Sequence, residues 1–102
     1  DLGEMLLTQG RLDEAKTLID DAIRLHTKID GADSWRTAAA RSARGEWLVR
    51  TGDRKRAEDE LTQAWAVLSH RPETDPRRKN AQHRLAALYR KSGREKEAAE
   101  LH

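Results

Sequence analysis

Apolar residues between positions 12 and 29 recur at spacings of three and four, which places them along one face of an α-helix. They are Leu12, Ala15, Leu18, Ile19, Ala22, Ile23, Leu25 and Ile29. The pattern along the rest of the chain predicts five more helices, over 1–9, 35–50, 54–70, 77–91 and 95–102. Ala, Leu, Glu, Lys and Arg dominate the composition, which favours helices over strands. The predicted fold class is therefore all-α.

The predicted helices fall into a repeat. Gly10, Gly52 and Gly93 are followed, five residues later in each case, by Ala15, Ala57 and Ala98. Leu6, Leu48 and Tyr89 stand four residues before the three glycines, and Ala22 and Ala64 form a further matched pair. A period of 41–42 residues indicates stacked units of supersecondary structure.

Each column of the repeat has a mechanical reason. A glycine at positive φ ends a helix at little cost, and the next helix begins within two or three residues. So short a turn makes the two helices antiparallel, and alanines on one face of the second helix let the pair approach closely. We therefore predict about three antiparallel helix pairs.

Breaks between the pairs are marked by Gly31 with Asp33-Ser34, and by Pro72 and Pro76. The expected organisation is one domain, 1–102, with repeats over about 1–33, 34–76 and 77–102. Because the sequence starts at Asp1 rather than Met, we expect a piece of a larger protein whose terminal pairs are incomplete.

Charge is unevenly spread along the chain, although the formal net charge is only +2. Residues 1–33 carry eight acids and four bases, whereas residues 34–102 carry ten acids and sixteen bases. A basic second half could attract phosphate or an acidic peptide. The chain has no cysteine and no apolar run of membrane-spanning length, so we expect a cytoplasmic protein that does not enter a membrane.

No catalytic constellation is visible. The four histidines lack the metalloprotease spacing, and the serines lack any motif of an activated nucleophile. The acid clusters Asp20-Asp21 and Glu58-Asp59-Glu60 are expected on the outer face of second helices, where a general acid has no dry cleft. We predict no catalytic residue, no metal and no cofactor, and hence a chain that is not an enzyme.

The repeat columns resemble the tetratricopeptide repeat family. The first repeat matches through Gly3, Leu6, Gly10, Ala15 and Ala22, the second through Gly45, Leu48, Gly52 and Ala57, and the third through Leu85, Ala86, Tyr89, Gly93 and Ala98. The long period is similar to that of kinesin light chains. The stretches after 28 and after 73 look like repeat arrays that follow bacterial serine/threonine kinase domains.

The resemblance implies a right-handed α-α superhelix whose first helices line a concave groove for a peptide or helix of a partner. The family's groove columns fall on Glu4, Leu7, Thr8, Ser42, Glu46, Val49, Arg50, His83, Ala87, Arg90 and Lys91. The implied function is protein–protein interaction, in a regulatory or scaffolding segment of a bacterial signalling protein such as a serine/threonine kinase.

Two alternatives stay open. A nucleic acid could bind through the bases of 50–56 and 77–84, although carboxylates interrupt the first cluster. Self-association could cover an exposed flank around Leu2, Leu6 and Leu101. Among the tryptophans, Trp65 is expected in the core and Trp47 at a repeat junction, while Trp35 would be an interface anchor if it were exposed.

Overall fold

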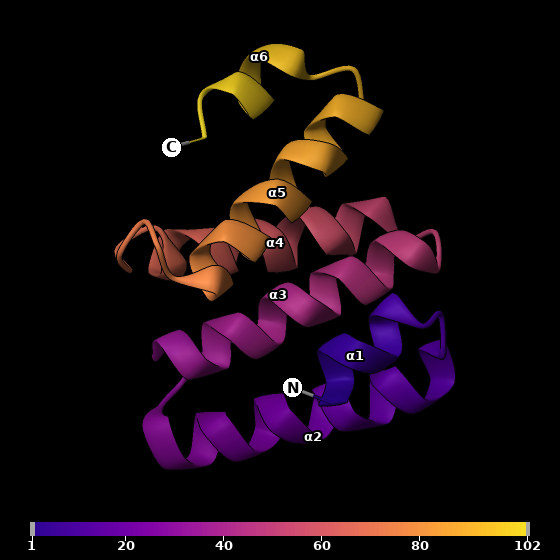
Figure 1. Cartoon of the computed structure of the whole chain (residues 1–102), viewed down its shortest axis with the longest axis vertical. Helices are drawn as coiled ribbons and strands as arrows, with labels where there is room; N and C mark the ends of the chain where they lie inside the picture. Colours follow the sequence, from indigo (N-terminus) through magenta and orange to yellow (C-terminus); the bar gives the residue numbers. More distant parts are fainter. Residues whose placement is uncertain (1, 102) are drawn as a thin grey trace.

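Six helices make up residues 2–101, which are the part of the chain that the computed structural model describes (Figure 1). They are α1 (Leu2–Thr8), α2 (Leu12–Asp30), α3 (Trp35–Arg50), α4 (Arg54–Leu68), α5 (Pro76–Lys91) and α6 (Glu95–Ala99). The predicted all-α class is confirmed. Two predicted ends are too long, since α4 stops at Leu68 and α6 at Ala99.

Side chains that accept a backbone hydrogen bond mark the starts of α3, α4 and α5. Ser34 accepts from the N–H of Thr37 at 3.1 Å and begins α3. Asp53 caps α4 and Asp75 caps α5 in the same way, the second of them with Pro76 in the first turn. These caps satisfy N–H groups that have no partner inside the helix.

The turn within each pair is closed identically in all three repeats. Gly10, Gly52 and Gly93 have φ values of 75°, 93° and 73°, so each lies at a turn and not within a helix. The residue after the glycine donates its N–H to the carbonyl of Leu6, Leu48 or Tyr89, over 2.9, 2.9 and 2.8 Å. This bond terminates the first helix and reverses the chain.

The alanine columns lie where paired helices touch. Ala15, Ala57 and Ala98 are buried, as is Ala64. Ala22 is only half-buried, because α1 is short and leaves this part of α2 uncovered. The repeat therefore places alanine at the helix contact in all three pairs. The exception is Ala22, which lies where α1 does not cover α2.

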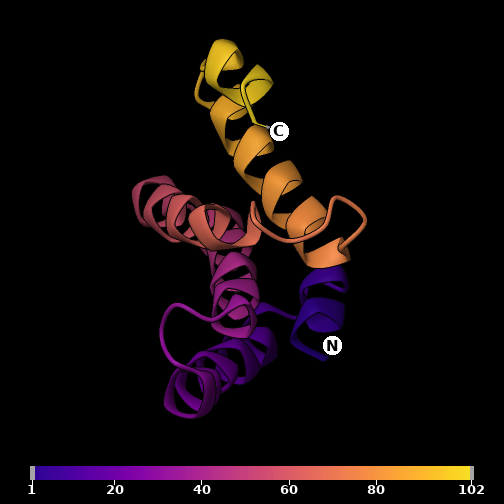
Figure 2. The ribbon, with the colours of Figure 1, turned by 90° about the vertical axis from the view of Figure 1, so that its left-hand side faces the viewer.

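Consecutive helices pack together along the long axis, from α2 at one end to α6 at the other (Figure 1). In addition, α3 contacts α1 and α5, which belong to the neighbouring pairs. Figure 2 shows α1 and α5 on one side of α3, and α2 and α4 on the other. The first helices of the three pairs are α1, α3 and α5. They therefore lie next to one another, with α3 in the middle.

The close approach of α3 and α4 depends on Gly45. A methyl group added at Gly45 would lie 2.5 Å from Cγ of Leu61, which is fully buried. Gly45→Ala should therefore lower the free energy of unfolding by about 2 kcal/mol or more through overpacking. Urea denaturation followed by circular dichroism measures this loss.

Gly52→Ala is the matched control, because nothing lies within 4 Å of its added methyl group. Its cost should be only the backbone strain at φ +93°, about 1 kcal/mol. In a double-mutant cycle, Leu61→Ala should relieve part of the Gly45→Ala loss and none of the Gly52→Ala loss. Strict additivity of Gly45→Ala and Leu61→Ala would contradict this account.

Candidate functional site

The three first helices are joined at one point by Arg84 of α5. One guanidinium nitrogen donates to Oγ of Ser42 in α3 at 2.9 Å, and the other donates to the carboxylate of Glu4 in α1. The Arg84 side chain is only 13% exposed, and Ser42 is 1% exposed. We name the surface around Glu4, Ser42 and Arg84 the first-helix face.

A second bond set ties α3 to α1 near the glycine turns. Arg50 donates from Nε to the Glu46 carboxylate at 2.8 Å and from Nη1 to the carbonyl of Leu7 at 2.8 Å. The Leu7 carbonyl belongs to the last turn of α1 and also accepts from the N–H of Gly10 at 3.0 Å. Arg50 therefore adds a side-chain bond from the neighbouring repeat to the end of α1.

The expected partner-binding residues divide by burial. Thr8, Arg50, His83, Ala87, Arg90 and Lys91 are exposed, and Glu4, Glu46 and Val49 are half-buried. Ser42 and Leu7 are buried, and their contact with a partner stays a prediction. Packing explains the burial: Ser42 lies beneath Arg84, and Leu7 belongs to the core formed by α1, α2 and α3.

The exposed residues differ in what surrounds them. Arg90 approaches Glu95, with Nε 3.9 Å from the carboxylate, and so leans toward α6 at the edge of the first-helix face. The hydroxyl of Thr8 donates to the Glu4 carbonyl within α1. The positions of these residues are now known, while their contact with a partner stays a prediction.

Arg84 was missed as a cross-repeat link by sequence reasoning, although a signal was present. Ser42 and Arg84 are 42 residues apart, which is one repeat length. A small hydroxyl residue and a long base at matching places on successive first helices can meet when the helices stack. The repeat period would have been sufficient to suggest this pair.

Charge is segregated by helix layer rather than by half of the chain. Together α1, α3 and α5 carry ten Lys and Arg residues against two carboxylates, Glu4 and Glu46. By contrast, α2, α4 and α6 carry ten acids against seven bases. Ion pairs cross between the layers, as in Arg44–Glu60 at 3.0 Å and Arg44–Asp20 at 3.7 Å.

Arginines surround Trp35 instead of leaving it open to a partner. The guanidinium groups of Arg36, Arg71 and Arg77 lie 4.3, 4.5 and 4.6 Å from the centre of its ring. Asp75 accepts from both Arg71 and Arg77. The backbone N–H of Arg77, followed by the side chain of Arg71, lowers the pKa of Asp75 below its ordinary value.

The other two tryptophans are half-buried. Nε1 of Trp47 donates to the Leu12 carbonyl at 2.8 Å, so Trp47 joins α3 to the start of α2 at the expected repeat junction. Trp65 packs against two hydrophobic clusters, one with Leu61 and Leu85 and one with Ala64 and Leu68. The expectation of a core position for Trp65 is therefore met in part, since its ring also reaches the surface.

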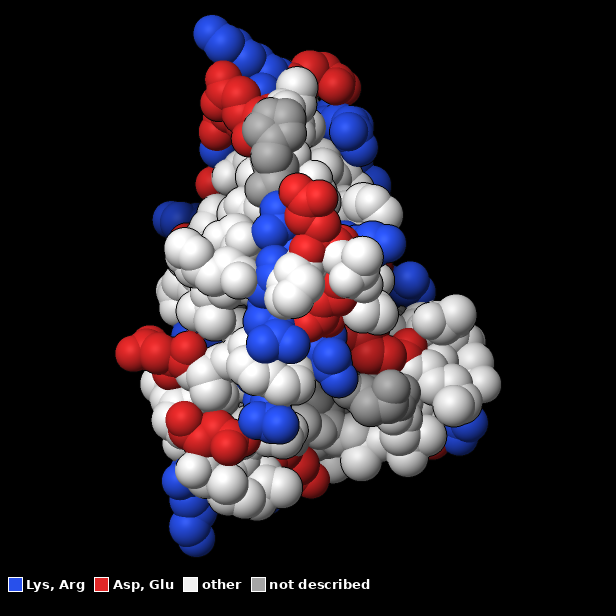
Figure 3. Space-filling model, turned by 60° about the vertical axis from the view of Figure 1, so that its left-hand side comes forward, with Lys and Arg blue, Asp and Glu red and all other residues white. Residues whose placement is uncertain are grey.

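Lys and Arg side chains form a column on the face drawn in Figure 3, with Asp and Glu side chains beside it. Several bases of the clusters expected for nucleic acid are engaged by carboxylates, among them Arg50 with Glu46 and Arg77 with Asp75. A phosphate backbone requires bases on one continuous face. No observation in residues 2–101 favours nucleic acid over protein as the partner.

Within residues 2–101, no group of three or more His, Cys, Asp or Glu side chains is placed to hold a metal ion. No helix in the same range is long and apolar enough to cross a membrane.

Comparison with known families gives one match. The tetratricopeptide repeat profile matches residues 1–69, which span α1 to α4. The chain therefore belongs to the tetratricopeptide repeat family, whose repeats are non-catalytic modules that generally mediate protein–protein interaction. Neither the curated proteins nor the solved structures contain a match to this chain.

Removal of Arg84 tests the link between the first helices. Arg84→Ala leaves the buried Ser42 hydroxyl and the Glu4 carboxylate without this donor, so the free energy of unfolding should fall by about 2 kcal/mol. Ser42→Ala should cost about 1 kcal/mol, and less than that once Arg84 is already Ala. Lys91→Ala on the same helix is the control and should change stability by less than about 0.5 kcal/mol. Equal losses for Arg84→Ala and Lys91→Ala would show that the link does not stabilise the fold.

Self-association was expected through a flank around Leu2, Leu6 and Leu101, and the exposure of these residues differs from that expectation in part. Leu2 is exposed as predicted, but Leu6 is buried and Leu101 packs against the last hydrophobic cluster. The other large exposed apolar residues are Met5, Leu25 and Ile29. The expected flank is thus corrected, and self-association through it stays a prediction.

Sedimentation velocity at high protein concentration should show a species heavier than the monomer. Leu2→Glu with Met5→Glu should return the chain to a monomer, because both substitutions put a carboxylate on the exposed apolar surface of α1. A strictly monomeric parent chain would contradict self-association.

Proposed function

We propose that this chain binds an extended or helical segment of another protein along the first-helix face, as a non-catalytic interaction module. The observation that carries the proposal is the bridge from Arg84 to Ser42 and Glu4, which joins consecutive first helices into one surface. In repeat arrays the first helices line the inner, concave side. A surface held in place by internal bonds loses little conformational entropy when a partner binds.

The exposed side chains on this surface suit recognition of a peptide. Arg50, His83 and Lys91 offer donors for carboxylates or backbone carbonyls, while Glu46 and Thr8 offer acceptors. Ala87 is exposed between His83 and Lys91 and leaves room for a partner's side chain. The proposed contact set is therefore Glu4, Thr8, Glu46, Arg50, His83, Ala87 and Lys91, with Arg90 at its edge.

The larger context is also a proposal. The long repeat and the texture of the stretches after 28 and after 73 support a regulatory or scaffolding segment of a bacterial signalling protein, such as a serine/threonine kinase. The cysteine-free composition supports a cytoplasmic location.

Site-specific cross-linking tests the binding face even while the partner is unidentified. A photoreactive phenylalanine placed at Ala87 or Thr8 should capture the same protein from a lysate of the source organism, because both positions lie on the first-helix face. The same probe at Lys55 of α4 is the matched control, since Lys55 is also exposed but belongs to a second helix.

A second experiment introduces a large charged residue on the first-helix face. With the probe at Thr8, the additional substitution Ala87→Arg should reduce the captured protein by about tenfold, while Lys55→Glu should leave its amount unchanged. Capture of the same protein with equal yield from Lys55 would contradict the proposed face.

A further inference from the structure

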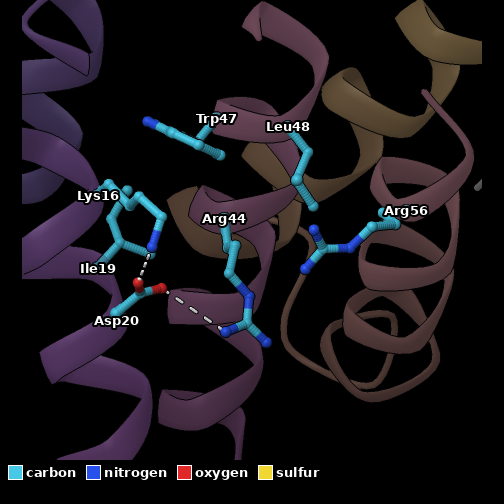
Figure 4. Close-up of a pocket in the computed structure, with 7 residues that line it drawn as sticks. All are labelled: Lys16, Ile19, Asp20, Arg44, Trp47, Leu48 and Arg56. Carbon is cyan, nitrogen blue, oxygen red and sulfur yellow. Dashed lines mark hydrogen bonds and ion pairs between the residues drawn. The ribbon is translucent and has the colours of Figure 1, made fainter. Parts of the chain in front are cut away.

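A hollow of about 230 Å³ lies between the first two repeats, on the side of α3 that faces α2 and α4. Its lining residues are Lys16, Ile19, Asp20, Arg44, Trp47, Leu48 and Arg56 (Figure 4). None of these residues belongs to the proposed contact set of the first-helix face. The hollow is thus a separate site, and α3 supplies residues to both.

The hollow has apolar walls that packing holds in place. Ile19 and Leu48 are buried members of two different hydrophobic clusters, at 3% and 2% exposure. Trp47 packs against both clusters, and its Nε1 hydrogen bond to the Leu12 carbonyl fixes the plane of its ring. A preformed apolar surface of this kind suits a planar ligand.

Three cations come together around these walls. In Figure 4, Lys16 from α2 and Arg56 from α4 approach from opposite sides, and Arg44 from α3 lies between them. Asp20 is the one carboxylate in the lining, with Lys16 at 2.6 Å and Arg44 at 3.7 Å.

The arginines are not fully satisfied by protein partners. The closest carboxylate contact of Arg56 is Asp53, at 3.8 Å, and Arg44 has a buried Nε without an acceptor. Glu60 accepts from Nη2 of Arg44 at 3.0 Å, so this carboxylate contacts one terminal nitrogen of the guanidinium group and not Nε. An anion placed between Arg44 and Arg56 would accept hydrogen bonds from both guanidinium groups.

We propose that this hollow binds a small organic anion, namely a single aromatic ring that carries a phosphate or carboxylate group. The ring rests on Trp47, Ile19 and Leu48, while the anionic group accepts from Arg44 and Arg56. A volume of about 230 Å³ is below the roughly 300–1,000 Å³ typical of sites for drug-sized ligands, which limits the ligand to about one ring. Guanidinium groups suit phosphate and carboxylate because they offer paired donors.

Nuclear magnetic resonance of the whole chain provides a local readout, because the indole N–H of Trp47 borders the hollow and Trp47→Phe identifies its signal. Phenyl phosphate should shift this signal in a saturable way. Inorganic phosphate, which lacks the ring, and benzyl alcohol, which lacks the charge, should each bind at least about tenfold more weakly.

Two variants separate the site from general attraction of anions. Arg56→Gln should weaken phenyl phosphate about three- to tenfold, and it should not disturb the fold because the Arg56 side chain is 71% exposed. Lys55→Gln removes the neighbouring positive charge outside the hollow and should leave the affinity unchanged. Arg44→Gln should weaken binding at least as much as Arg56→Gln, provided that circular dichroism shows the parent helix content.

Several outcomes would overturn the proposal. Equal affinity of Arg56→Gln and the parent chain would show that Arg56 does not bind the anion. Equal binding of phenyl phosphate and inorganic phosphate would show that the apolar walls do not contribute to binding. Equal binding of phenyl phosphate and benzyl alcohol would show that the charge of the ligand does not contribute. A shift of the Trp35 and Trp65 signals as large as that of Trp47 would also contradict a specific site.

Discussion

Close contact between paired helices at alanine is the constraint on which the rest of the structure depends. Ala15, Ala57 and Ala98 are almost completely buried, each five residues after the glycine that reverses the chain. Because the turn has only a few residues, the two helices must lie side by side. Larger side chains at these positions would overpack the contact at a cost of about 1–3 kcal/mol. The spacing of the pairs, and with it the stacking of the first helices, follows from this contact.

Helix α3 gains its central role from that stacking. One side of α3 contacts α1 and α5, and the opposite side contacts α2 and α4. Ser42, Glu46 and Arg50 face the first helices, whereas Arg44 and Trp47 face the hollow between second helices. Helix α3, whose Gly45 packs against α4, therefore contributes residues both to the first-helix face and to the hollow.

Helix positions were largely predictable because local signals mark them. Glycine at positive φ, Asp or Ser at a helix start, and apolar residues at spacings of three and four act over one or two turns of chain. The burial that prediction missed depends on packing between helices. Ser42 is covered by Arg84, Leu6 by the packing of α1 on α2, and Leu101 by the cluster around Leu48, Leu61 and Leu85, so these three side chains are less exposed than expected from the sequence.

By itself the sequence determined the class of fold, the three glycine turns and the alanine contacts, since each of these depends on residues close together in the chain. Only the tertiary structure decided which charges meet. The bases of α3 and α5 and the acids of α2, α4 and α6 are intermixed along the chain, and they separate into layers only when the pairs stack. The physical reason is distance: ionic contacts act within about 4 Å, and Arg84 and Glu4 come that close although 80 residues separate them.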